Sequence, residues 1–240
     1  MTASLCDQLI EQAKSVLATG RDPLVIFDLD GTLYDNRTRT FRILEEYAHQ
    51  EAERLPELLR AAQNLRLDDV EYLMVDTLKS VDFTDENAIQ GLMAYWKTCF
   101  FTDEYVELDL PIPGAATFVR RLHAEGVIPV YLTGRDAPNM LKGTVSCLHR
   151  DKFPVGTVDT RIVLKDRFER PDEEYKEAVI ASIQRSGEVI AAFDNEPGLC
   201  NLFHKAFPSA AVCLLDTSHG PGAPPLDAGL QRAPDFIGLL

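Results

Sequence analysis

The sequence predicts an α/β protein, with a three-layer Rossmann-like core around a parallel sheet and an inserted α-helical cap. Two observations favour this fold class. Five short apolar runs alternate along the chain with segments of helical periodicity, and one long helical stretch interrupts this alternation after the first run. Strands that alternate with helices indicate a parallel sheet, because parallel neighbours need a crossover connection.

The first apolar run, residues 23–27, leads directly into two carboxylates, Asp28 and Asp30, and a Gly31-Thr32 pair. A run this short and this apolar is typical of a buried parallel strand. Side chains alternate along a strand, so Asp28 and Asp30 should point to the same side. Buried charge needs compensation, which a hard cation such as Mg²⁺ provides. The simpler alternative is a turn in which the aspartates cap backbone amides.

The other apolar runs also end in polar residues. They cover residues 127–132, 161–164, 189–193 and 211–215. The residues that directly follow the first three of these runs are Thr133, Gly134, Arg135, Lys165, Asp194, Asn195 and Glu196. Ligands bind beyond the carboxyl ends of the strands in open parallel sheets. We therefore expect one site at this edge of the sheet.

Residues 34–110 are too many for a simple crossover and predict a helical insert. Three apolar stripes at helical spacing occur in it, starting at Phe41, Leu67 and Ile89, and Pro56 should break or kink the first helix. We expect residues 1–33 and 111–240 to form the core, with hinges near Asn36 and Pro111. Residues 34–110 would form a lid over the site.

Composition limits the possible functions. The 240 residues are 45% hydrophobic and 26% charged, and their formal net charge is −14, which disfavours nonspecific binding to nucleic acid or anionic lipid. The first apolar stripe, residues 5–17, predicts a structural helix rather than a signal peptide, and no run is long enough to span a bilayer. Five cysteines without metal-like spacing predict reduced thiols and a cytoplasmic location. The sequence contains no feature that indicates the oligomeric state.

Three motifs resemble those of the haloacid dehalogenase superfamily. The segment Asp28-Leu29-Asp30-Gly31-Thr32-Leu33 is similar to its first motif, Leu132-Thr133-Gly134-Arg135 to its second, and Phe193-Asp194-Asn195-Glu196-Pro197 to its fourth. The resemblance extends over about residues 23–216, and the insert resembles the helical cap of the superfamily.

The resemblance implies a phosphatase with an aspartyl-phosphate intermediate. Asp28 would be the nucleophile, and Asp30 would act as general acid and base. Mg²⁺ would bind to Asp28, the Asp30 carbonyl and Asp194. Thr133 and Gly134 would bind phosphate oxygens. The fourth motif lacks a common second aspartate, so Asn195 and Glu196 become candidates near the metal.

The third motif of the family is a lysine, and the sequence offers two. Lys165 ends an apolar run, whereas Lys176 lies in the first turns of a predicted helix. The shorter spacing to Asp194 favours Lys176 as the catalytic lysine, and Lys165 stays open as a substrate-binding alternative. Each lysine also has a plainer interpretation. Lys176 could pair with Asp172 on the helix surface, and Lys165 could be an ordinary charge at the end of a strand.

The sequence predicts little about substrate choice. Arg135 directly follows the predicted phosphate-binding turn and is the preferred anion-binding residue. Three arginines follow the first motif, and we interpret them mainly as solvated charges at a helix start: Arg37, Arg39 and Arg42.

The predicted function is hydrolysis of a small phosphorylated metabolite. The alternatives are a phosphomutase, a polynucleotide end-phosphatase and a non-catalytic binding protein of the same fold. Asp30 disfavours dehalogenation, which needs no proton donor at that position.

Overall fold

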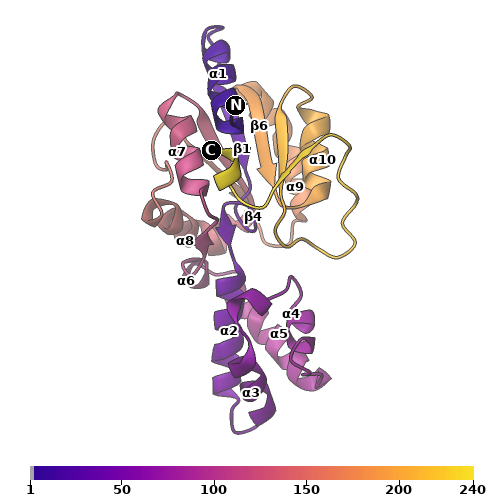
Figure 1. Ribbon diagram of the computed structural model, residues 1–240. Coiled ribbons are helices and arrows are strands. Elements are labelled where there is room, and N and C mark those ends of the chain that lie inside the picture. The colour runs from indigo at the N-terminus through magenta and orange to yellow at the C-terminus, as the bar shows by residue number, and fades with distance from the viewer. Residues whose placement is uncertain (1–2) are drawn as a thin grey trace.

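The computed structural model describes residues 3–240, and its core is a six-stranded parallel sheet in the order β5-β4-β1-β6-β7-β8 (Figure 1). The predicted fold class is therefore confirmed. The strands are β1 (Pro23–Phe27), β4 (Ile128–Asp136), β5 (Arg161–Lys165), β6 (Glu188–Asp194), β7 (Ala211–Leu215) and β8 (Gln231–Ala233). The short strand β8 was not predicted, because residues 231–233 carry only one buried apolar side chain, Ala233.

Helices cover both faces of the sheet, which gives the three layers. They are α1 (Leu5–Leu17), α7 (Ala115–Ala124), α8 (Ala137–Arg150), α9 (Asp172–Ser186) and α10 (Pro197–Ala206). Alternation along β1 divides the core: Val25 and Phe27 pack with α1, α7 and α8, whereas Leu24 and Ile26 pack with α9 and α10.

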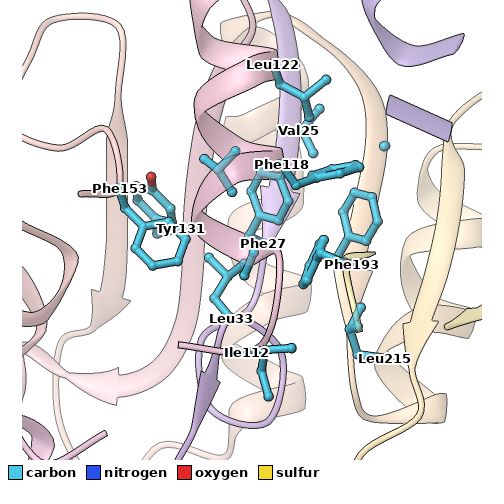
Figure 2. Packing of buried hydrophobic residues seen from close by; sticks show 14 of the residues in the cluster. Val25, Phe27, Leu33, Ile112, Phe118, Leu122, Tyr131, Phe153, Phe193 and Leu215 are labelled. Atoms are coloured by element: carbon cyan, nitrogen blue, oxygen red, sulfur yellow. The ribbon is translucent and has the colours of Figure 1, made fainter. Parts of the chain in front are cut away.

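Aromatic side chains fill the layer between β1, β6 and α7 (Figure 2). Phe27 and Phe193 stack with ring centroids 5.2 Å apart, and the Phe118 ring meets Phe193 edge-on at 5.3 Å. All three side chains are fully buried. Each such pair contributes about 0.5–1.5 kcal/mol beyond its buried area. This packing fixes the ends of β1 and β6, from which Asp28 and Asp194 continue.

The segment between β1 and α7 forms a helical insert with its own apolar core, beyond one end of the sheet (Figure 1). Its elements are α2 (Arg37–Gln50), α3 (Pro56–Asn64), the 3₁₀ turn η1 (Leu67–Asp69), α4 (Met74–Lys79) and α5 (Glu86–Phe100). The first helix ends at Gln50, and Pro56 starts α3 instead of interrupting a longer helix, since the first turn of a helix tolerates proline.

Two features at the boundaries of the insert differ from the prediction. A two-stranded antiparallel ribbon, β2 (Tyr34–Asp35) with β3 (Leu110–Pro111), joins the insert to the core. The short helix α6 (Asp103–Val106) packs on α8, where Asp103 accepts a hydrogen bond from the Gly143 amide at 2.6 Å. Two-residue strands and a single helical turn are too short to leave a periodic pattern.

Of the helices within residues 3–240, none combines the length and the apolar character that crossing a bilayer requires.

Candidate active site

Asp28 and Asp194 lie side by side at the carboxyl ends of two neighbouring central strands. The Asp28 amide donates to the Phe193 carbonyl at 3.0 Å, so the ladder between β1 and β6 continues one residue past β1. Both side chains are buried, with 6% of Asp28 and 1% of Asp194 exposed. Parallel register therefore brings together two carboxylates that lie far apart in sequence.

Lys176 bridges these two carboxylates. It lies on α9, and its Nζ donates to Asp28 Oδ1 at 2.7 Å and to Asp194 Oδ2 at 2.8 Å. The ammonium is buried, and burial alone would lower its pKa, but attraction by Asp194 and Asp28 raises the pKa of Lys176 well above its usual value. Lys176 is therefore charged.

The group formed by Asp28, Asp194 and Lys176 carries one more negative than positive charge. Burial, together with repulsion from Asp194, raises the pKa of Asp28 to about 8, although Lys176 opposes this shift. The site therefore favours either a proton on Asp28 or a further cation beside it.

A divalent cation fits this donor set. Hard cations prefer oxygen ligands, and the two carboxylates and the Asp30 carbonyl are the candidates predicted from the sequence. Within residues 3–240, no cluster of three or more His, Cys, Asp or Glu side chains is arranged around a common point. A metal here would therefore rely on two carboxylates, with carbonyl and water oxygens completing its coordination.

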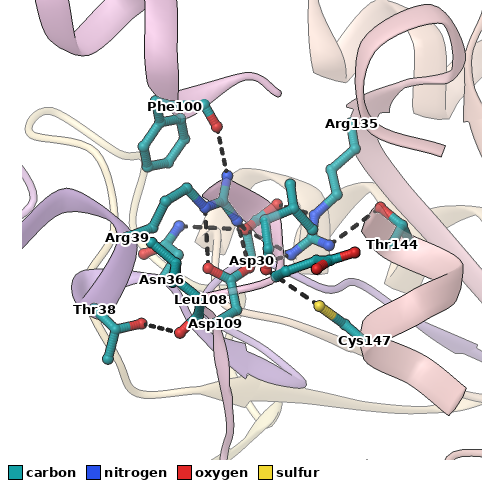
Figure 3. Close-up of polar contacts among 12 residues, drawn as sticks. Asp30, Asn36, Thr38, Arg39, Phe100, Leu108, Asp109, Arg135, Thr144 and Cys147 are labelled. Atoms are coloured by element: carbon teal, nitrogen blue, oxygen red, sulfur yellow. Dashed lines mark hydrogen bonds and ion pairs between the residues drawn. The ribbon is translucent and has the colours of Figure 1, made fainter. Parts of the chain in front are cut away.

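Asp30 belongs to a second, separate group of charges with Arg39, Arg135 and Asp109 (Figure 3). Arg135 holds Asp30 through both Nε, at 2.8 Å, and Nη2, at 3.0 Å, and Arg39 Nη2 lies 2.7 Å from Asp30 Oδ1. Both arginines also bind Asp109, which is completely buried. Two arginines and two aspartates make this group neutral.

The arginines determine the charge state of Asp30. Burial opposes a charge on this carboxyl, but attraction by Arg135 and Arg39 outweighs burial and holds the pKa of Asp30 well below its usual value. In this arrangement Asp30 favours its ionised form, and the two arginines oppose its protonation.

The second predicted motif lies at the end of β4, with Thr133 completely buried. The Thr133 hydroxyl accepts a hydrogen bond from the Arg135 amide at 3.2 Å, and Gly134 lies beneath the Asp172 carboxylate, so closely that a Cβ at 134 would stand 2.0 Å from Asp172 Oδ2. All three motif residues line the cavity that contains Asp28. The prediction that Arg135 binds a substrate anion does not agree with its contacts, because its guanidinium is held by Asp30, Asp109 and Thr144.

Lys165 is not brought to Asp28. Its Nζ donates to Asp172 Oδ1 at 2.8 Å and to the carbonyls of Phe168 and Arg170 at 3.2 and 3.0 Å. These contacts fold residues 166–171 into a loop at the cavity wall. The interpretation of Lys165 as a substrate-binding cation is therefore replaced by a role in holding this loop.

Asn195, predicted to lie near the metal, uses its side chain for loop contacts. Its Nδ2 donates to the Ser218 carbonyl at 2.7 Å, and its Oδ1 accepts from the Thr32 hydroxyl at 3.4 Å. The amide packs against Gly31, whose φ of +78° suits glycine. Glu196 is half-buried, lines the cavity and accepts from the Gly220 amide at 3.2 Å.

Two residues of the site could not be recognised from the sequence. Arg39 lies in a polar stretch of α2 that resembles a solvated helix start, and Asp109 precedes β3 without any motif around it. A buried ion pair between positions 39 and 109 has no local signature, since it depends on both ends of the insert meeting at the ribbon.

A family model for haloacid dehalogenase-like hydrolases matches residues 23–197. The chain belongs to this family. The predicted resemblance and the predicted class of enzyme, a hydrolase, are thereby confirmed. Hydrolases of this family generally use a divalent metal ion, in agreement with the uncompensated charge beside Asp28.

Solved structures show the same fold at low sequence identity. Protein Tyrosine Kinase A (PtkA) from Mycobacterium tuberculosis is 15% identical with a TM-score of 0.54, and the match covers 91% of this chain and 96% of that one. A HAD-superfamily hydrolase of subfamily IA, variant 1, from Geobacter sulfurreducens is 13% identical with a TM-score of 0.52, covering 89% and 92%.

The Class C acid phosphatase from Bacillus anthracis is 17% identical over 80% of this chain, with a TM-score of 0.39, and this chain spans 62% of its length. A search of curated proteins finds no match.

Proposed function

We propose that this protein is a Mg²⁺-dependent phosphomonoester hydrolase that acts on a small phosphorylated metabolite through an aspartyl-phosphate intermediate. The observation that carries the proposal is the contact of Lys176 with both Asp28 and Asp194. A buried carboxylate, held by an ammonium and placed at the carboxyl edge of a parallel sheet, is suited to nucleophilic attack on phosphorus.

The reaction would have two steps. In the first, Asp28 attacks phosphorus, the bond to the leaving oxygen breaks, and that oxygen takes a proton. In the second, water attacks the aspartyl phosphate and loses a proton, which releases inorganic phosphate and restores Asp28. Mg²⁺ held by Asp28, Asp194 and the Asp30 carbonyl would supply positive charge beside the transferred phosphoryl group.

Asp30 is the candidate that would donate a proton in the first step and accept one from water in the second. Both roles pass through its protonated form, which the contacts with Arg39 and Arg135 oppose. Arg39 belongs to the insert and Arg135 to the core. A movement of α2 relative to β4 would loosen these contacts, so we propose that proton donation accompanies movement of the insert.

The remaining groups would bind the phosphate and protect it from solvent. Thr133 and Gly134 are the proposed partners of the phosphoryl oxygens. Residues of the insert line part of the cavity that contains Asp28, and there the insert would exclude water. Five unbridged, buried cysteines support a reducing compartment such as the cytoplasm.

The experiment is release of inorganic phosphate from a panel of phosphomonoesters, with and without Mg²⁺. Asp28→Asn should abolish turnover, because an amide cannot form the aspartyl phosphate. Asp22→Asn is the matched control, since the exposed Asp22 lies just before the other end of β1. Normal phosphate release by Asp28→Asn would refute the proposal.

The same panel separates the alternatives. A phosphomutase would move the phosphate to a second hydroxyl of the substrate instead of to water. A polynucleotide end-phosphatase would prefer oligonucleotide ends, which the net charge of −14 disfavours. A binding protein would leave every ester intact.

A further inference from the structure

The cavity that contains Asp28 continues away from it, between the insert and the core, and has a volume of about 680 Å³. Its inner end is lined by Asp28, Thr133 and Lys176, where the phosphoryl group is proposed to bind. The outer part must hold whatever the phosphate is attached to. The chemistry of that outer wall therefore indicates the leaving group.

Aromatic rings form one side of the outer part. On α5 and just after it, Trp96 and Phe100 stack with centroids 4.3 Å apart, and Phe101 meets Phe100 edge-on at 5.0 Å. Phe168, from the loop that Lys165 holds, meets Phe101 at 4.7 Å. These four rings line the cavity, and the Phe101–Phe168 contact joins the insert to the core.

Apolar side chains also contribute to the lining of the outer part. They are Tyr72, Leu73, Met74 and Met93, and Tyr72 and Leu73 keep 53% and 41% of their surface exposed. A large apolar side chain that stays exposed inside a cavity is available to a ligand. Methionine adapts its shape and makes favourable contacts with aromatic rings.

The indole and the cationic side chains of this wall already have partners within the protein. The Trp96 indole donates to the Thr40 hydroxyl at 3.4 Å, and the Arg37 guanidinium is bound by Asp35 at 2.7 Å. Lys165 is held by Asp172 and two carbonyls, as described above. A polyhydroxylated leaving group such as a sugar needs many free hydrogen-bonding partners, and this wall offers mainly carbon and sulfur.

The charge of the outer wall disfavours a second anionic group. Glu71, Glu169 and Glu196 line the cavity, whereas the arginine and lysine side chains there are paired with carboxylates. A leaving group with its own carboxylate or phosphate would meet negative charge without a free cation.

From these observations we infer that the substrate is a phosphomonoester of a planar aromatic alcohol that is neutral or cationic. Its ring would contact the aromatic wall of Trp96 and Phe168 and the apolar side chains of Tyr72 and the two methionines of the lining. This inference rests on the proposed phosphatase function and specifies the substrate class of the same site.

The first test compares esters whose leaving oxygens are all primary alkoxides, so that differences in leaving-group acidity stay small. Benzyl phosphate should have a kcat/KM about tenfold or more above that of glycerol 3-phosphate, because ring stacking and apolar contact both favour the aryl ester. Cyclohexylmethyl phosphate should fall between them, since it is apolar but not planar. 4-Carboxybenzyl phosphate should be a poorer substrate than benzyl phosphate.

Variants from the insert and from the core test the aromatic wall itself. Trp96→Leu and Phe168→Leu should each lower the ratio of kcat/KM for benzyl phosphate to that for glycerol 3-phosphate, by about three- to tenfold. Tyr95→Leu is the matched control: Tyr95 is an aromatic neighbour on α5 that packs against Tyr47 outside the cavity, and the ratio should stay the same.

A binding measurement separates this inference from the proposed reaction. Trp96 is the only tryptophan of the chain, so its fluorescence reports on the cavity. 4-Nitrobenzyl phosphate should quench it in Asp28→Asn, which is expected to bind without turnover, and glycerol 3-phosphate should not.

Each outcome has one meaning. Turnover with glycerol 3-phosphate equal to or faster than benzyl phosphate would overturn the inference and leave the phosphatase proposal intact. Quenching by the aryl ester without phosphate release from any ester would overturn the phosphatase proposal and keep the aromatic site. The absence of both quenching and turnover would overturn the aromatic site and the phosphatase proposal together.

Discussion

Lys176 Nζ lies 2.7 Å from Asp28 Oδ1, although 148 residues separate the two in sequence. The contact arises because α9 packs against the sheet beside β4 and β6 with Lys176 on its buried face. The buried ammonium stabilises two carboxylates at once, which explains how Asp28 and Asp194 can share one corner of the core.

The two candidate lysines should respond differently to the same substitution. Lys176→Met leaves two buried carboxylates without their ammonium and should lower kcat by about 100-fold or more, a loss typical of a removed electrostatic partner. Lys165→Met should lower kcat by about fivefold or less, because Lys165 acts on a loop. Phosphate release measures both, with circular dichroism to confirm folding. The reverse order would make Lys165 the catalytic lysine.

Metal binding should stabilise the protein through Asp194. Mg²⁺ at about 100 times its dissociation constant should add about 2.7 kcal/mol to the free energy of unfolding, which for a chain of this size raises Tm by about 5–10 °C. Asp194→Asn should remove most of this shift. Asp216→Asn, at the end of the neighbouring strand β7, should keep it, since Asp216 lies outside the cavity. Equal shifts in all three proteins would place the metal elsewhere.

Arg39 should matter for stability as well as for activity. Arg39→Met leaves the completely buried Asp109 with Arg135 as its remaining arginine partner, and a broken buried ion pair typically costs about 3–5 kcal/mol. Urea denaturation should show this loss. Arg42→Met, three residues further along α2 and largely exposed, should change the free energy of unfolding by about 0.5 kcal/mol.

A double variant provides the check on this interpretation. Arg39→Met combined with Asp109→Leu removes the buried acid together with its partner, so part of the lost stability should return. If the double variant lost more free energy of unfolding than the two single variants lose together, the broken ion pair would not be the cause of the instability of Arg39→Met.

Two glycines with the same backbone angle form a matched pair. Gly31 and Gly20 both have φ of +78°, so alanine at either position should cost about 1–2 kcal/mol of backbone strain. At Gly31 the new Cβ would also stand 2.3 Å from Asn195 Nδ2, whereas at Gly20 it meets open space. Gly31→Ala should therefore lose about 1–3 kcal/mol more than Gly20→Ala in urea denaturation. Equal losses of stability in the two variants would mean that the Asn195 side chain moves away from the new Cβ without a cost in free energy.

The sequence was sufficient for five of the six strands of the sheet and for the pairing of Asp28 with Asp194. Short, continuous apolar runs with abrupt polar ends identify buried strands, and the residues that follow parallel strands meet at one edge of the sheet. Asp28 and Asp194 could therefore be predicted to converge. Lys176 was preferred by motif spacing, and its contact with Asp28 follows from helix packing that no local pattern specifies.

Only the tertiary structure decided which cations are free and which are paired. Arg135 and Lys165 look alike as charges after strands, yet one is held by Asp30 and Asp109 and the other by Asp172. Local sequence determines where a side chain starts, and its partner depends on elements that come together only in the folded chain. The ionised state of Asp30 and the aromatic wall around Trp96 and Phe168 arise in the same way, from contacts between the insert and the core.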